Sequence, residues 1–237
     1  MRFGSYLALI ALVVVTGCAQ QPKKLAFNKV GAQHIKTVVV TRSPNQETYE
    51  AAVLGHPGMS FGLVGGLIAA ADIQAKSNRL TAAIDAAETR LQERTASLLS
   101  DAMAKAGYDT KIVPVTKRAG LDQAALEIVN SGVQTDSVLL VETVGSYLAA
   151  GPSTDYFPFV VVRVRSVDSK SGKTLYEDTL TYGYAMSNTQ TVHFASDATY
   201  RFGSIEALTA DPKKTRQGLY AGVEAIVAQI AQDMTRD

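Results

Sequence analysis

The chain has no tryptophan, one cysteine and only three histidines among its 237 residues. A single cysteine cannot form an internal disulfide, so a disulfide-stapled scaffold is excluded. His34, His56 and His193 share no spacing typical of zinc ligands, and no pair of cysteines supplements them. The lack of tryptophan counts against a sugar cleft built on aromatic platforms. We therefore expect neither a metal nor a cofactor.

An excess of charge of one sign is also lacking. The 23 lysines and arginines nearly balance the 22 aspartates and glutamates, and the net charge is +1. The only concentrated basic tracts are Lys23-Lys24 and Lys213-Lys214, whereas nucleic-acid binding requires an extended basic face. We expect no nucleic-acid partner. Hydrophobic residues make up 46% of the chain and charged residues 19%, which is ordinary for a globular protein with a packed core.

No hydrophobic run reaches the roughly twenty residues that a membrane-spanning helix requires. The run at the amino terminus, Tyr6 to Val15, follows the positive charge of Arg2 and ends at Val15-Thr16-Gly17-Cys18. Its length of about ten residues is that of a signal-peptide core. The last four residues resemble the bacterial lipobox, in which a signal peptidase cuts before a cysteine that carries lipid. The resemblance implies that residues 1–17 are removed and that Cys18 is acylated.

An acylated Cys18 accounts for the odd cysteine, because its thiol then takes no part in disulfide or redox chemistry. Each buried methylene contributes about 0.8 kcal/mol, so several acyl chains form an effectively permanent anchor in a lipid bilayer. Ala19 follows the cysteine. In proteobacterial lipoproteins an aspartate there retains the protein at the inner membrane, so the resemblance implies the periplasmic face of the outer membrane. The alternative is a secretory signal without lipidation, in which the cysteine is incidental.

About 220 residues remain after processing, enough for one α+β domain and a tether. Residues 18–35 are mostly polar, contain Pro22 and show no periodicity, so we predict a flexible tether. Residues 36–237 are predicted to form a single periplasmic domain.

Stretches rich in β-branched and aromatic residues predict strands at 34–42, 108–115, 137–147, 159–166 and 174–184. The unbroken Val38-Val39-Val40 indicates a strand buried on both faces. Residues 168–172 are rich in turn formers and predict a hairpin between the last two strands.

Helical spacing of apolar residues predicts one long helix over 72–106 and a short one over 122–130. The apolar stripe of the long helix consists of Leu80, Ile84, Ala87, Leu91, Leu98 and Ala102. Gln92 lies on another face of that helix. The residues expected to point inward from the short helix are Ala125, Leu126 and Val129. A closing helix begins with Asp211 as its cap and Pro212 at its first position.

This order of elements predicts an α+β fold, with a single mixed or antiparallel sheet and long helices packed on one face. Three local sequences accompany it: "AKAGY" at the end of the long helix, "TDSVLLVE" at 135–142 and "DSKSGKTL" at 168–175. Over 36–184 the chain thereby resembles periplasmic lipoproteins related to the curli-secretion channel lipoprotein, the TolB amino-terminal domain and the neisserial surface-lipoprotein group. The resemblance implies a role in envelope assembly, transport or secretion, carried by interactions rather than chemistry.

Glycines four residues apart, Gly58, Gly62 and Gly66, mark the segment 58–71. On a helix they share one face and allow close approach of another backbone. The apolar run of about thirteen residues would reach roughly 20 Å as a helix, which is too short to span a bilayer. Two interpretations stay open: a membrane or oligomer contact, and a buried helix or glycine-rich loop packed on the domain's own sheet.

One motif suggests chemistry. Gly58-Met59-Ser60-Phe61-Gly62 matches the G-x-S-x-G pattern of serine hydrolases. Such a site would need Ser60, His193 and an acid such as Asp197, but a convincing strand before Ser60 is missing. The glycines are better explained by the four-residue repeat.

Aromatic residues bracket the turn at Gly151-Pro152, and three of them, Tyr156, Phe157 and Phe159, follow it closely. If exposed, they form a partner-binding tip. The alternative is a loop folded over the edge of the core.

The sequence as a whole predicts a non-enzymatic, outer-membrane-anchored lipoprotein that serves as a structural or accessory component of an envelope assembly, transport or secretion system. Its expected partners are the bilayer and either envelope proteins or copies of itself. One alternative is an oligomeric or pore-forming secretion component that uses the glycine segment. The other is a membrane-associated serine hydrolase that uses Ser60.

Overall fold

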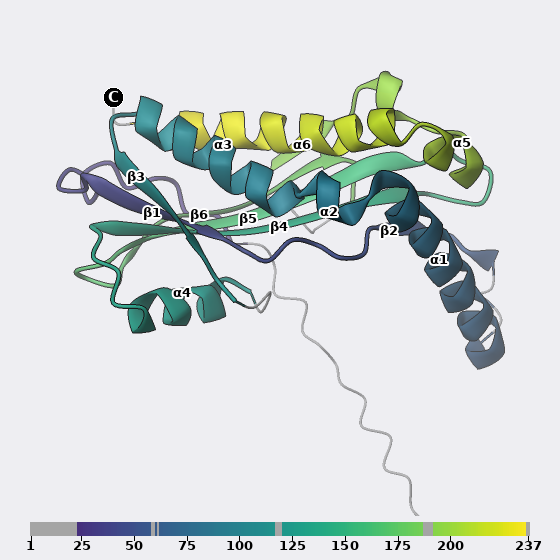
Figure 1. The fold of residues 1–237 in the computed structure, drawn as a ribbon, viewed down its shortest axis with the longest axis horizontal. Coiled ribbons are helices and arrows are strands. Elements are labelled where there is room, and N and C mark those ends of the chain that lie inside the picture. The colour runs from purple at the N-terminus through teal and green to yellow at the C-terminus, as the bar shows by residue number, and fades with distance from the viewer. Residues whose placement is uncertain (1–22, 58–59, 61, 117–119, 187–191, 236–237) are drawn as a thin grey trace, which may run out of the picture.

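The three valines of β1 (Thr37–Arg42) place this strand inside a sheet, between β3 (Asp109–Pro114) and β4 (Ser137–Ala149). A computed structural model describes residues 23–57, 60, 62–116, 120–186 and 192–235 (Figure 1). The other strands are β2 (Glu50–Val53), β5 (Phe157–Asp168), β6 (Thr174–Gly183) and β7 (Val192–Ala195). The predicted strands are all present, and β2 and β7 add to them.

The sheet is mixed, with the strand order β3-β1-β4-β5-β6-β7, and β2 pairs with β4 beyond the end of β1. β1 runs parallel to β3 and β4, and β2 also runs parallel to β4. β5 is antiparallel to both β4 and β6, and β7 is parallel to β6. Helices lie in the connections between the parallel strands β1, β3 and β4, whereas the antiparallel strands β5 and β6 are joined by a hairpin. The predicted α+β class is confirmed.

The helices are α1 (Gly62–Ile84), α2 (Ala86–Thr89), α3 (Leu91–Lys105), α4 (Leu121–Asn130), the 3₁₀ helix η2 (Ala198–Tyr200), α5 (Ile205–Ala210) and α6 (Pro212–Asp233). α3 and α6 lie side by side over one face of the sheet, and α4 lies on the other (Figure 1). Val38 and Val40 therefore belong to the large core under the long helices, whereas Val39 belongs to the small core under α4. No helix within the described ranges is long and apolar enough to cross a membrane.

The long helix predicted over 72–106 is in fact three helices, so that prediction is wrong. The breaks fall at Asp85, with φ 49°, and Arg90, with φ 39°. The Asp85 carboxylate accepts hydrogen bonds from the first backbone N–H groups of α2 and so caps a new helix. After the breaks the buried stripe runs through Leu91, Thr95, Leu99 and Met103. Leu98 and Ala102 are only partly buried, and Gln92, expected on another face, is buried.

The short helix is present as α4, but its predicted inward face is wrong. Ala124 and Ile128 are buried beneath it. Leu126 and Val129 are 57% and 75% exposed. Ala125 lies between, partly buried against the small core.

Two buried glutamines complete the edge of β4 in the gap between β1 and β2. The side chain of Gln46 accepts a hydrogen bond from Gly145 N at 3.0 Å and donates one to Gly145 O at 2.7 Å. Gln92 donates to Thr143 O at 3.0 Å and accepts from Gln46 N at 2.9 Å. These amides take the place of a neighbouring strand, because buried backbone groups need partners.

Candidate functional site

Cys18, the predicted lipid-attachment residue, and Gly58 lie outside the described residues. The description of the chain begins at Lys23, five positions after Cys18. The segment from Lys23 to Ile35 is attached to the sheet, so the prediction of a flexible tether through residue 35 is wrong for its described part. Ala32 and Ile35 are 4% and 2% exposed and belong to the large core.

The attachment runs along the outer edge of β6. Leu25 and Glu177 exchange backbone hydrogen bonds of 2.7 and 3.1 Å in an antiparallel bridge. The Lys24 ammonium lies 3.3 Å from the buried carboxylate of Asp178. Burial raises the pKa of Asp178, and the neighbouring Lys24 offsets part of that rise. An unpaired β edge gains partners in this way.

Two further aspartates hold the start of β1 and the β5–β6 hairpin. Asp136 accepts hydrogen bonds from the backbone N–H groups of Lys36 and Thr37 at 2.8 and 2.9 Å. Asp168 accepts two bonds of 2.8 Å from backbone N–H groups of its own hairpin. Hydrogen bonds from backbone amides lower the pKa of both carboxyls. The acidic positions of "TDSVLLVE" and "DSKSGKTL" therefore have local structural roles.

The glycine segment opens α1, whose first turns project past the end of the sheet (Figure 1). An added Cβ at Gly66 would meet nothing within 4 Å. Leu67 and Ile68, next to it, are 64% and 60% exposed, whereas Ala69 is fully buried. Gly62 is the first residue of the helix. Close packing on the domain's own sheet therefore does not explain Gly66, and this face of α1 is open.

A polar cluster lies farther along α1. Asp72 forms an ion pair with Lys76 at 2.6 Å, and its carboxylate lies 3.4 Å from Nε2 of His56. Burial alone would lower the pKa of Lys76, but the hydrogen bond that Lys76 donates to Asp72 and the nearby Tyr156 raise it overall. Burial likewise raises the pKa of Tyr156. Lys76 and Tyr156 both keep their protons at neutral pH, so neither acts as a base.

Nothing in the described part of the chain joins Ser60, His193 and Asp197 into a catalytic triad. Ser60 is exposed just before α1. The His193 ring bonds the Thr181 hydroxyl at 3.1 Å, and Asp197 accepts a hydrogen bond from Thr199 N at 2.7 Å. Each side chain is thus occupied locally, and the geometry for nucleophilic catalysis is absent among these residues.

The predicted aromatic tip is wrong at Tyr156. This residue is 5% exposed and bridges the backbone of Phe202, so it belongs to the core. Phe157 and Phe159 are half-buried. The Phe157 ring packs edge-on against Tyr184, with centroids 6.1 Å apart, and lies 4.9 Å from the Arg201 guanidinium. The alternative, a loop folded over the edge of the core, describes Tyr156.

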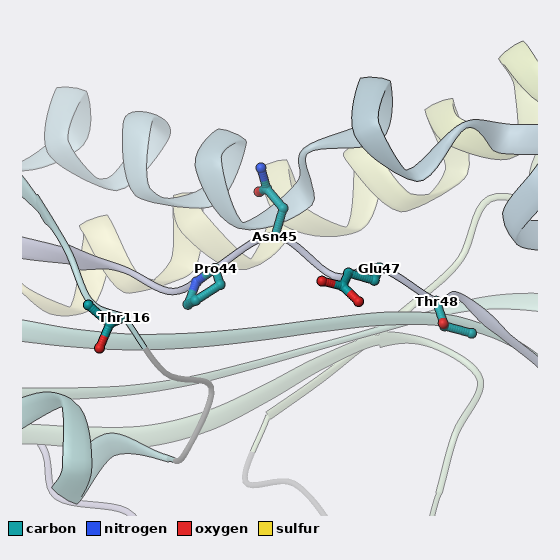
Figure 2. A pocket seen from close by; sticks show the side chains of 5 residues that line it. All are labelled: Pro44, Asn45, Glu47, Thr48 and Thr116. Atoms are coloured by element: carbon teal, nitrogen blue, oxygen red, sulfur yellow. The ribbon is translucent and has the colours of Figure 1, made fainter.

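A shallow pocket of about 400 Å³ lies where the parallel strands β1 and β3 end (Figure 2). Its lining comes from Pro44, Asn45, Glu47 and Thr48 of one loop and Thr116 of another. Ligands of open α/β sheets often bind at this kind of edge. These five side chains include one titratable group, however, and so contain no acid–base pair. Over the described ranges, no cluster of His, Cys, Asp or Glu is arranged to hold a metal ion.

No family model matches the chain, and no curated protein matches it. Similar solved structures include the PelC dodecamer from Paraburkholderia phytofirmans, 12% identical over 91% of this chain and 97% of that chain, with a TM-score of 0.32. The hypothetical protein CT253 from Chlamydia trachomatis is 14% identical over 85% of this chain and 99% of that chain, with a TM-score of 0.38. At these identities and TM-scores the likeness bears on neither function nor assembly.

Proposed function

We propose that this chain is an acylated lipoprotein of the bacterial outer membrane. Its periplasmic α+β body would serve as a non-enzymatic structural or accessory component of an envelope assembly, transport or secretion system. The observation that carries the proposal is Cys18, the only cysteine of the chain, directly after a signal-like apolar run and Val15-Thr16-Gly17. The attachment of Leu25 to β6 supports it, because a short connection would hold the body close to the lipid.

The description of the body as non-enzymatic is supported by the side chains themselves. Ser60, His193 and Asp197 have separate local surroundings, and Lys76 is held protonated beside Asp72. The aspartates with lowered pKa bond backbone amides and stabilise turns. Perturbed pKa values of this kind accompany structural networks as well as active sites.

Metabolic labelling with radioactive palmitate tests the proposal. The wild-type chain should take up label and sediment with outer membranes, and Cys18→Ser should do neither. Ala19→Ser is the matched control, since it alters the next residue but keeps the thiol, and it should still be labelled. Equal labelling of wild type and Cys18→Ser would refute the proposal.

The open face of α1 favours a second candidate, an oligomeric secretion component. Gly66 would let another helix approach closely, and Leu67 and Ile68 would lose exposed apolar surface against it. Fully burying each of these two side chains contributes about 1.5–3 kcal/mol.

Sizing in a mild detergent tests this second candidate. The wild type should elute as an oligomer, and Gly66→Leu or the pair Leu67→Glu and Ile68→Glu should elute as monomers. Val129→Glu on α4 is the matched control, because Val129 is an equally apolar residue that is 75% exposed. A monomeric wild type, or variants of unchanged size, would contradict self-association through α1.

A further inference from the structure

We propose that one end of the molecule is a docking surface for the anionic headgroups of a phospholipid bilayer. The surface consists of residues 23–36 and the β5–β6 hairpin, and we call it the basic end. The inference deepens the proposed function and rests on it, because the lipid on Cys18 brings this end to the membrane.

The fold assembles the basic end from two segments that are distant in sequence. The bridge between Leu25 and Glu177 is followed by a hydrogen bond from Asn28 N to Leu175 O, 2.9 Å long. Residues 29–34 then form turns, so the chain leaves β6 at Lys29. The two segments thereby bring their lysines to one part of the surface, and clustered like charges favour an external anion.

The basic end carries an excess of exposed positive charge. Residues 23–36 include four lysines and no aspartate or glutamate, and the hairpin adds Lys170 and Lys173. All of these lysines are exposed, and within the described ranges no ion pair engages Lys29, Lys170 or Lys173.

Carboxylates at the same end offset only part of the charge of these six lysines. Asp136 bonds the backbone of Lys36 and Thr37, and Asp168 bonds its own turn and the ring of His34 at 2.9 Å. Asp178 is buried beside Lys24. These three carboxylates keep their negative charge, but they are fewer than the six lysines. Lys29, Lys170 and Lys173 have no ion pair among the described residues, so they can meet an outside anion such as a lipid phosphate.

Apolar side chains project among these lysines. Leu25 is 43% exposed and Val30 is 77% exposed. Surfaces that lie on a membrane combine lysines with apolar residues that enter the headgroup region. A nucleic-acid surface would not require the two apolar residues.

The short length of chain between Cys18 and the described residues favours a bilayer as the partner of this surface. Four residues lie between Cys18 and Lys23, and the five Cα–Cα steps that join them span about 18 Å when fully extended. The basic end therefore stays near the headgroups whenever the lipid is inserted. The open face of α1 lies at the opposite end of the long axis (Figure 1), so docking in this way would leave α1 directed toward other proteins.

Protection of lysines from an amine-reactive reagent tests the inference. The purified, acylated full-length protein is inserted into vesicles of phosphatidylcholine alone, or with about 30 mol% phosphatidylglycerol, an anionic lipid. Reaction at each lysine is read by mass spectrometry, with the exposed Lys213 as internal reference. We expect Lys29 and Lys173 to react about five-fold more slowly in anionic vesicles, and the difference to vanish in about 0.5 M salt. Equal rates in the two vesicles would overturn the docking surface.

Two variants and a flotation assay separate this inference from the proposed function. Lys29→Glu and Lys173→Glu should each remove the protection of the other lysine, whereas Lys213→Glu should leave it intact. Flotation with phosphatidylcholine vesicles is measured first. A protein that does not float has no lipid anchor, and the proposed function fails together with the inference. A protein that floats but shows equal rates overturns the docking surface alone. Protection that is equal in both vesicles and lost on dilution would assign the basic end to a second copy.

Discussion

Side-chain amides can replace a strand, as Gln46 does at the edge of β4. Its amide bonds both the N–H and the carbonyl of Gly145, and it is 5% exposed. Gln92 extends the arrangement to Thr143 and bonds Gln46 as well. A network of this kind stabilises the fold only when every member has its partners.

Removing the amide should therefore cost more than an ordinary polar substitution. Gln46→Ala leaves the buried N–H and carbonyl of Gly145 without partners, which costs about 1–3 kcal/mol per group. We expect the free energy of unfolding to fall by about 2–4 kcal/mol, measured by urea denaturation.

Gln232→Ala is the control for this prediction, because Gln232 is exposed near the end of α6. Its effect should stay within about 0.5 kcal/mol. Similar losses in the two variants would show that Gln46 does not support the β4 edge.

Elements with strong local signals agree with the sequence. β1 is marked by consecutive valines, and α6 begins as expected, with Asp211 accepting a hydrogen bond from Lys214 N and Pro212 in its first turn. These signals act within a few residues, so the sequence alone suffices for them.

The helical region between β2 and β3 shows where local signals fail. Neither Asp85 nor Arg90 breaks a helix by propensity in the way proline does, yet both adopt positive φ values there. The breaks turn the apolar stripe, so Gln92 enters the core although periodicity places it elsewhere. α4 has apolar residues on several sides, and only its contact with the sheet decides that Ile128 is buried and Val129 exposed.

The candidate sites also differ in whether a local sequence signal predicts them. The sequence before Cys18 is a local signal and is readable at once. The basic end depends on the pairing of Leu25 with Glu177, which are more than 150 residues apart. The one signal in the sequence was the absence of acidic residues from 23–36. Tyr156 shows the converse, because its burial comes from a bridge to Phe202 that no local pattern predicts.

The two ends of the molecule differ in the surfaces that they carry. The loop before β1 and the β5–β6 hairpin lie at one end of the long axis, and the open face of α1 lies at the other (Figure 1). Three aspartates tie the amino-terminal segment and the hairpin to the sheet: Asp136, Asp168 and Asp178. The stability of this end should therefore depend on the protonation of these carboxyls.

Acid should destabilise the protein, because the pKa shifts of these carboxyls make the free energy of unfolding depend on pH. The lowered pKa values of Asp136 and Asp168 give stability that is present above the unfolded value, near 3.9, and is lost as pH falls through the folded values. Asp178, whose pKa is raised by burial, acts in the opposite direction. Asp178 acts mainly above the unfolded value, whereas Asp136 and Asp168 act below it, so we expect the urea midpoint to decrease as the pH falls below about 4. Asp136→Asn should reduce this decrease and lower the midpoint at neutral pH, because an amide cannot accept both backbone N–H groups as strongly as a carboxylate. Asp178→Asn should instead change the profile above about pH 4, since it removes the group that favours the folded state as the pH falls toward that value. If the profile of Asp136→Asn coincided with that of the wild type, the carboxylate would not be holding β1 to β4.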